Sequence, residues 1–234
     1  MDEKDRRRAV GDRRWRIDDG PSVDPDLIAW YPCDESRTGV GFDASGNGNH
    51  GTCSDCPVVT EGLDGGACLF DNGQSIVIEH NASFELQAFT LAAWARPEPL
   101  APDTLYTVVA KPAGTEQRNA YELGFNSFSA SDVALMCYGS GTESGCHSTP
   151  VVIGQWVHLA MTYDEDGARL YIDGELRAED TPALDGIGFD GAPLLIGLDY
   201  DDGIEAHPML GLVDDVQLYA RALEPDEIAA LAAL

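Results

Sequence analysis

Residues 155–174 read QWVHLAMTYDEDGARLYIDG, and this stretch decides the class of fold. From Trp156 to Tyr163 successive side chains alternate between two distinct faces, which is the two-residue period of a β-strand. A polar turn at 164–167 leads into a second alternating run, and that run ends at Asp173-Gly174, a strong signal for a tight hairpin. Three strands joined by two tight turns form an antiparallel meander. The sequence therefore predicts an all-β core.

The same stretch carries a family resemblance. The pattern G-x-W-x-H-x-A-x-T-Y-D followed by L-Y-I-D-G resembles the signature of laminin-G-like jelly-roll domains, in the wider concanavalin-A-like lectin/glucanase superfamily. Further matches occur in the family's order at 43–51, 66–71, 89–94, 195–197 and 211–219. The resemblance covers residues 27–234 and implies a two-sheet antiparallel β-sandwich. It implies no particular activity, because one fold hosts many functions.

The chain has 234 residues, an ordinary size for one large β-sandwich. Residues 1–25 lack periodicity and contain Gly20-Pro21-Ser22, so we expect a basic flexible tail or linker there and a single jelly-roll domain over 26–234. A short C-terminal helix is predicted to begin near Pro225, because proline and acidic residues favour a first helical turn.

The net charge of −27 is extreme and unevenly distributed. Half of the basic residues lie in the tail: Lys4, Arg6, Arg7, Arg8, Arg13, Arg14 and Arg16. The acidic remainder repels nucleic acid and anionic lipid, which argues against nucleic-acid binding. Its acidity is interpreted as a solubility or salt adaptation, with attraction to basic partners as the alternative. The tail is expected to be disordered, to bind an anionic polymer or to fold back onto the acidic body. No apolar run is long enough for a membrane span, so no membrane insertion is expected.

Six cysteines form an even set: Cys33, Cys53, Cys56, Cys68, Cys137 and Cys146. Cys137 and Cys146 flank a Gly/Ser-rich loop, as in a disulfide-closed hairpin. The other four could form disulfides, remain free thiols or, with His50 nearby, hold zinc. Disulfides are the preferred interpretation, and they imply an oxidising compartment and hence an extracellular or cell-surface protein. No signal-peptide core precedes the domain, which leaves open a cytoplasmic protein or a chain that begins after its export signal.

A structural calcium ion is the predicted cofactor. In the run 210–218, Asp214 shares one face with Leu212 and Val216, and a buried carboxylate needs a compensating partner. The loop at 43–51 offers carboxylate, amide and backbone oxygens of the kind that calcium prefers. The resemblance implies that calcium ties the N-terminal region to the last long strand. The predicted ligands are Asp43, Asp214, Asp34 and Asn47. The alternative is that Asp43 caps an Asx-turn and Asp214 accepts backbone N–H bonds.

Ligand binding is expected where aromatic platforms meet polar groups. The candidate residues are Tyr106, Tyr121, Tyr138, Tyr200, Asp201 and Asp202. The last three lie in an acidic loop at 199–205, and the alternative interpretation is a solvated loop without a binding role. Aromatic residues in alternating strands more often belong to a core.

The sequence contains no Glu-x-Asp-x-Glu strand, no Gly-x-Ser-x-Gly elbow and no phosphate-binding loop, so no catalytic residue is predicted. We expect a non-catalytic recognition module of an exported or surface protein that binds a glycan or protein ligand. Two alternatives remain open at this point. One is a polysaccharide hydrolase or lyase on the same fold, and the other is a structural domain whose acidic face binds a basic protein.

Overall fold

A computed structural model describes residues 24–233 except for 35–39, 64, 72, 114–118, 129–131, 141–142, 182–183 and 185. The predicted tail therefore lies outside the described residues apart from Asp24 and Pro25. Asp24 accepts a hydrogen bond from Arg221 Nη2 at 3.1 Å. The described chain is thus tied to the C-terminal region from its first residue.

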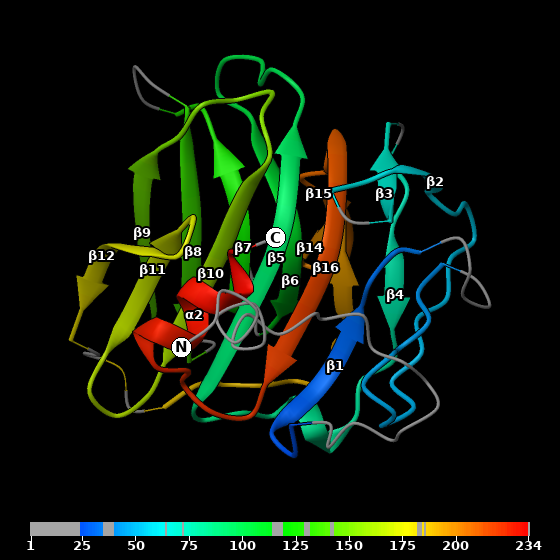
Figure 1. Cartoon of the computed structure of the whole chain (residues 1–234). Coiled ribbons are helices and arrows are strands. Elements are labelled where there is room, and N and C mark those ends of the chain that lie inside the picture. The colour runs from blue at the N-terminus through cyan, green and yellow to red at the C-terminus, as the bar shows by residue number, and fades with distance from the viewer. Residues whose placement is uncertain are drawn as a thin grey trace, which may run out of the picture.

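Two antiparallel sheets pack face to face as a sandwich (Figure 1). Sheet A has the strand order β12-β11-β10-β5-β16-β3-β2, and β1 also pairs with β16. Its strands are β1 (Leu27–Tyr31), β2 (Val58–Glu61), β3 (Gly66–Phe70), β5 (Phe89–Pro97), β10 (Val157–Tyr163), β11 (Ala168–Ile172), β12 (Glu175–Asp180) and β16 (Gly211–Tyr219).

Sheet B has the strand order β4-β13-β6-β7-β8-β9. Its strands are β4 (Ile76–Ile78), β6 (Leu105–Pro112), β7 (Asn119–Asn126), β8 (Val133–Gly139), β9 (Ser144–Pro150) and β13 (Leu194–Ile196). A separate two-stranded hairpin consists of β14 (Asp199–Asp201) and β15 (Ile204–Ala206). Among the described residues, the helical elements are a 3₁₀ turn, η1 (Ala82–Phe84), and the helix α2 (Pro225–Leu231). The predicted all-β sandwich with a C-terminal helix is confirmed.

The meander predicted from 155–174 is present as β10, β11 and β12. Strand β10 pairs on its other side with β5 in an unbroken register from Val157 to Tyr163. Asp173 and Gly174 have φ angles of 51° and 79°. Left-handed backbone at both central residues is the requirement of a type I′ hairpin turn, which explains why this sequence turns here.

The core lies between the two sheets, where aromatic rings of one sheet meet those of the other. Phe89 of sheet A and Tyr121 of sheet B have ring centroids 4.8 Å apart. Tyr138 of sheet B lies 5.2 Å from Tyr163 of sheet A. All four side chains are buried. Aromatic contacts of this kind contribute to stability beyond the burial of apolar area alone.

Strand β16 contains a bulge that changes which side chains face the core. Its pairing with β5 shifts register between Asp214 and Gln217, and Asp215 has a left-handed φ of 49°. Val213 and Val216 both belong to the core cluster although they are three residues apart. Because strand side chains alternate, Asp214 lies on the opposite, outer face of sheet A. The prediction that Asp214 shares a face with Val216 is therefore wrong.

Strands β1 and β3 both pair with the same edge of β16. Strand β1 pairs from Val216 onward and β3 pairs as far as Val213, so the two strands separate at the bulge. The disulfide between Cys33, which follows β1, and Cys68 of β3 joins them again. We call the region around this disulfide the fork. It contains Asp34, which follows Cys33, Asp214 of β16, and the two glycines that these acids contact, Gly65 and Gly62.

All six cysteines form disulfides: Cys33–Cys68, Cys53–Cys56 and Cys137–Cys146. The predicted disulfides, including the closed hairpin, are confirmed. The zinc and free-thiol alternatives are excluded, because every sulfur is already bonded to another sulfur.

Helix α2 covers part of the outer face of sheet A. Pro225 begins the helix, and Glu224 and Glu227 form a capping box at its N-terminus. Ile228 is completely buried in a small cluster with Ala160, Tyr171 and other residues of that face. No helix among the described residues is long and apolar enough to cross a bilayer.

Candidate functional site

Asp43, a predicted metal ligand, uses its buried carboxylate to hold its own loop. Oδ1 accepts hydrogen bonds from the backbone N–H groups of Trp30 at 3.0 Å and Ser45 at 2.9 Å. Oδ2 accepts one from the backbone N–H of Asn49 at 2.9 Å. These contacts match the alternative interpretation, in which Asp43 caps an Asx-turn and attaches the loop to β1.

Asn47 belongs to the same loop and fastens it to the same strand. Its Nδ2 donates to the carbonyl oxygens of Leu27 at 2.7 Å and Ile28 at 3.1 Å. The structure therefore places Asp43 and Asn47 in a hydrogen-bonded loop beside β1. Their contacts are those of residues that hold a loop in place.

The other two predicted metal ligands, Asp34 and Asp214, meet in the fork. A Cβ atom added to Gly65 would lie 2.2 Å from Asp34 Oδ1, and one added to Gly62 would lie 2.8 Å from Asp214 Oδ2. Both carboxyl groups thus contact the turn at 62–66. Burial raises the pKa of Asp214 to about 7, helped by the negative charges of Asp215 and Asp34 and opposed by backbone N–H bonds.

The oxygen atoms in the fork are of the type that calcium binds. Two carboxyl groups close together are the kind of oxygen ligands that suit a hard cation. Over the described part of the chain, no three His, Cys, Asp or Glu side chains are arranged as a metal site. The fork therefore brings together two of the predicted residues, Asp34 and Asp214, and not the four-residue set expected from the sequence.

Three of the predicted ligand-binding residues are in the interior. Tyr106, Tyr121 and Tyr138 are buried in the core cluster between the sheets. The alternating pattern of β6, β7 and β8 directs these rings inward, so they cannot form a surface platform. Their assignment to ligand binding is corrected.

The other three, Tyr200, Asp201 and Asp202, lie on the β14–β15 hairpin. Tyr200 and Asp201 are half-buried and Asp202 is exposed. Asp202 and Gly203 have φ angles of 53° and 77°, so an Asp-Gly turn closes the hairpin. Asp201 Oδ2 lies 3.1 Å from His207 Nε2. Residues 199–205, expected to be a loop, are therefore an ordered hairpin.

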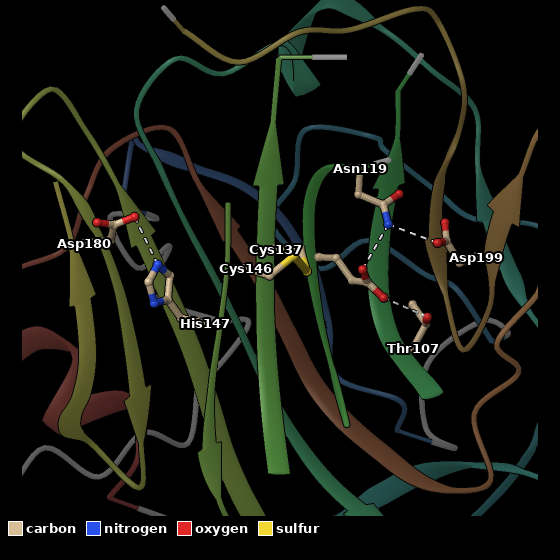
Figure 2. The surroundings of a disulfide bond; sticks show 8 residues. Thr107, Asn119, Cys137, Cys146, His147, Asp180 and Asp199 are labelled. Carbon is tan, nitrogen blue, oxygen red and sulfur yellow. Dashed lines mark hydrogen bonds and ion pairs between the residues drawn. A yellow bond between two sulfur atoms is a disulfide. The ribbon is translucent and has the colours of Figure 1, made fainter. Parts of the chain in front are cut away.

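A buried polar network attaches this hairpin to sheet B (Figure 2). Asn119 Nδ2 donates to Glu122 Oε2 at 3.0 Å and to Asp199 Oδ2 at 2.9 Å. Thr107 Oγ1 donates to Glu122 Oε1 at 3.0 Å, and the backbone N–H of Tyr200 donates to Asp199 Oδ1 at 2.7 Å. We call Asn119, Glu122 and Asp199 the amide-bridged acid pair.

The two acids titrate abnormally because they are buried together. Glu122 is 3% exposed and Asp199 is 2% exposed. Burial raises the pKa of both carboxyl groups. The negative charge of Asp199 raises the pKa of Glu122 further, and that of Asp201 raises the pKa of Asp199. The hydrogen bonds from Thr107 and Asn119 act in the opposite direction. The site therefore favours a protonated state of the pair.

The cross-strand disulfide Cys137–Cys146 lies beside this network. In Figure 2 it lies between Asn119, Asp199 and Thr107 on one side and the His147–Asp180 contact on the other. His147 Nε2 lies 3.1 Å from Asp180 Oδ2. That contact joins β9 of sheet B to the end of β12 of sheet A. Because β9 and β12 are edge strands of their sheets, the contact links the two sheets at one edge of the sandwich.

Sequence reasoning missed Thr107, Asn119 and Glu122. A local signal existed for Glu122, since it is the one charged residue between the apolar Tyr121 and Leu123 of an alternating strand. Its partner Asp199 is 77 positions further along the chain (199 minus 122) and could be found only in the fold.

Solved structures with the same fold include several binding domains. The chain is similar to the binding domain of Paraclostridial Mosquitocidal Protein 1, with a TM-score of 0.72, 16% identity and coverage of 90% of this chain and 52% of that one. It is similar to domain 4 of an extracellular arabinanase from Geobacillus stearothermophilus solved with arabinotriose, with a TM-score of 0.68, 20% identity and coverage of 88% and 98%.

The receptor-binding domain of botulinum neurotoxin C/D mosaic serotype also matches, with a TM-score of 0.68, 13% identity and coverage of 88% and 51%. The chain spans about half the length of the two toxin domains. At these identities the likeness establishes the fold alone. No curated protein matches the sequence.

A family model described as the concanavalin A-like lectin/glucanases superfamily matches residues 70–229. These residues include most of both sheets, the β14–β15 hairpin and the start of α2. The chain belongs to the concanavalin A-like lectin/glucanase superfamily.

Proposed function

We propose that the chain is a non-catalytic recognition module that binds a glycan at the β14–β15 hairpin. The observation that carries this proposal is the attachment of the hairpin through the amide-bridged acid pair. Asp199 is buried and each of its carboxylate oxygens accepts a hydrogen bond, which holds the start of the hairpin in place. A ligand that binds there meets a preorganised surface and loses little free energy to ordering the protein.

The groups that the hairpin presents suit a sugar. Tyr200 supplies a partly exposed ring for an apolar sugar face. Ile204, which pairs with Asp201 across the hairpin, is 71% exposed. Asp202, exposed at the turn of the hairpin, supplies a carboxylate acceptor for hydroxyl groups, whereas Asp201 is paired with His207. The fold is shared with an arabinanase domain solved with arabinotriose and with a botulinum neurotoxin type C whose cell entry depends on two ganglioside molecules. These likenesses support a glycan as the ligand class.

The arrangement of the buried acids supports a binding role over hydrolysis. A glycosidase needs two carboxyl groups that flank the scissile bond with room for the sugar. Here Asn119 lies between Glu122 and Asp199, bonded to both within 3.0 Å. The space that a substrate would need is filled by the amide.

Glycan arrays with the full chain at defined calcium concentration test the proposal. We expect saturable binding without release of reducing ends, and Tyr200→Ala should weaken it roughly tenfold, which corresponds to about 1.4 kcal/mol. Phe128→Ala is the matched control, because that ring is 59% exposed in a different loop. Release of reducing ends would establish the hydrolase or lyase alternative. Equal loss in both variants would remove the hairpin from the site.

A second candidate function rests on the net charge of −27. An acidic surface attracts basic proteins, and that attraction weakens with ionic strength. Capture of polylysine at low salt, lost at high salt, together with silence on the glycan array, would favour a structural domain that binds a basic protein.

We also propose a structural calcium ion in the fork, with Asp34 and Asp214 as its side-chain ligands. EDTA should lower the melting temperature, added calcium should restore it, and the Asp34→Asn/Asp214→Asn variant should respond to neither. Asp43→Asn is the control, because it disturbs the loop beside β1 and should leave the calcium response in place. Identical melting curves of the native protein in EDTA and in calcium would refute the site.

The three disulfides support an extracellular or cell-surface location, because such bonds persist in oxidising compartments. Thiol titration of the purified protein in denaturant without reductant should find no free thiol. Six free thiols would remove the argument for export.

A further inference from the structure

The three disulfides differ in their surroundings. Cys33 and Cys68 are buried in the core, and their bond closes the fork over a sequence separation of 35. Cys53 and Cys56 are separated by 3 positions on a surface loop where Cys56 is exposed. Loop-closure entropy increases with loop length, so the Cys53–Cys56 bond constrains the unfolded chain least.

The loop that holds Cys53 and Cys56 is anchored on both sides without its disulfide. Thr52 forms an antiparallel bridge with Val77, with backbone hydrogen bonds of 2.8 and 2.7 Å. Val58 begins β2 and pairs with Leu69 of β3. Because both flanks are held by backbone pairing, opening this disulfide leaves the sheets intact.

Cys137–Cys146 is a different case although Cys146 is also exposed. The two residues face each other within the β8–β9 ladder, with Cα atoms 4.2 Å apart. The ladder keeps the two sulfurs opposite each other after any cleavage, so the bond closes again at high effective concentration. Cys137 is half-buried and pairs in register with the buried Glu122. A thiolate leaving at that position would be poorly solvated.

We propose that the Cys53–Cys56 disulfide is a thiol-exchange site that opens while the protein remains folded. An incoming thiolate attacks Sγ of the exposed Cys56, a new S–S bond forms, and the Cys53–Cys56 bond breaks with Cys53 leaving as a thiolate. The module then carries the incoming thiol covalently on Cys56. Attack of the Cys53 thiolate on that mixed disulfide releases the thiol and restores the original bond.

The charge of the site selects among thiols. Asp55 lies between the two cysteines and is exposed, and the whole chain carries a net charge of −27. An anionic thiol is repelled during approach and a cationic thiol is attracted, with a difference that salt screens. The favoured partner is therefore a positively charged thiol. This inference does not depend on glycan binding.

Cysteamine and glutathione serve as the cationic and anionic probes on the full, folded chain at equal thiolate concentration. After timed reaction, acid quench and alkylation, peptide mapping should show Cys53 and Cys56 reacting at least tenfold faster than the other four cysteines. The cysteamine adduct should be found on Cys56. The circular dichroism spectrum should not change, and cysteamine should react faster than glutathione at low salt with the difference reduced at high salt.

Cys53→Ser/Cys56→Ser is the matched variant, expected to keep the native spectrum and to lose the fast phase. A fast phase that persists in this variant, or that maps to Cys137 and Cys146, would overturn the proposal. Opening of Cys53–Cys56 only together with loss of the native spectrum would also overturn it. Equal rates for the two probes at low salt would reject the charge selection.

Discussion

At the scale of single residues, Glu122 has the least ordinary surroundings. Among the described residues its carboxyl group is bonded only to the neutral side chains of Thr107 and Asn119, and another acid, Asp199, shares the same amide. Two buried negative charges without a cation cost several kcal/mol, so the folded protein retains a proton there. The β14–β15 hairpin is therefore attached to sheet B through a pair of acids that retains a proton.

Glu122→Gln should therefore remove a pH dependence of stability. The folded pKa of Glu122 is raised, so the folded protein binds a proton that the unfolded chain releases above the usual glutamate pKa of about 4.3. Between the unfolded pKa and the raised folded pKa, the folded state binds more protons than the unfolded state, so the free energy of unfolding falls as pH rises through that range. Urea unfolding at mildly acidic and alkaline pH should show this fall in the native protein and a smaller fall in the variant. An equal pH dependence of the unfolding free energy in the two proteins would contradict a raised pKa at Glu122.

His158 should produce the opposite dependence at low pH. Burial lowers its pKa to about 4, against about 6.5 in the unfolded chain. Below pH 6.5 the unfolded chain takes up a proton that the folded protein refuses, so stability is lost as pH falls towards 4, by about 3 kcal/mol in total. His158→Phe, which preserves a ring beside Trp94, should flatten the acid limb of the stability curve. His80→Gln, at a surface contact with Glu85, should leave that limb unchanged.

At the scale of elements, the bulge in β16 organises the outer face of sheet A. It splits β1 from β3 and leaves a gap in the pairing where Asp214 lies against the turn at 62–66. A bulge inserts one extra residue and bends the strand, so the faces before and after it are exchanged. The proposed calcium ion would sit where the sheet is interrupted.

Gly62→Ala tests how tightly the turn packs in the fork. The added Cβ would lie 2.3 Å from the carbonyl oxygen of Gly66 and 2.8 Å from Asp214 Oδ2, so backbone must move. We expect a loss of about 2–4 kcal/mol in the free energy of unfolding, in the range of severe packing defects. Gly73→Ala is the control, since nothing lies within 4 Å and only its positive φ of 75° resists the change, at about 1 kcal/mol. A similar loss at both positions would mean that the fork tolerates the methyl group.

Elements were predicted well where the signal is local. The meander, the Asp173-Gly174 turn and the helix at Pro225 each depend on residues within a few positions of one another, and all three are present. The hairpin at Asp202-Gly203 carries the same Asp-Gly signal, yet its acidic flanks made it resemble a solvated loop. The acidic composition of 199–205 suggested a loop, although the Asp202-Gly203 pair favours a tight turn.

At the scale of the whole molecule, the dominant quantity is the net charge of −27. Like charges on the surface repel one another and favour the expanded chain, so this repulsion lowers the stability of the folded state. The buried aromatic contacts between the sheets and the three disulfides oppose that expansion.

Added salt should therefore stabilise the protein. Sodium chloride screens the repulsion beyond a Debye length of about 10 Å at 0.1 M and about 3 Å at 1 M. The melting temperature should rise by several degrees over this range in the presence of EDTA, which removes any contribution from calcium. A melting temperature that does not change would show that the surface charges are already locally compensated.

The amino-acid sequence by itself determined the class of fold, the meander, the C-terminal helix and the closed hairpin at Cys137 and Cys146. These features depend on short-range alternation, turn chemistry and spacing, which any stretch of chain carries within itself. Only the tertiary structure decided that Asp214 faces outward, because one left-handed residue in β16 reverses the alternation. Only the fold brought Asn119 to Asp199 and turned Tyr121 inward, because contacts across 80 positions depend on how the two sheets pack.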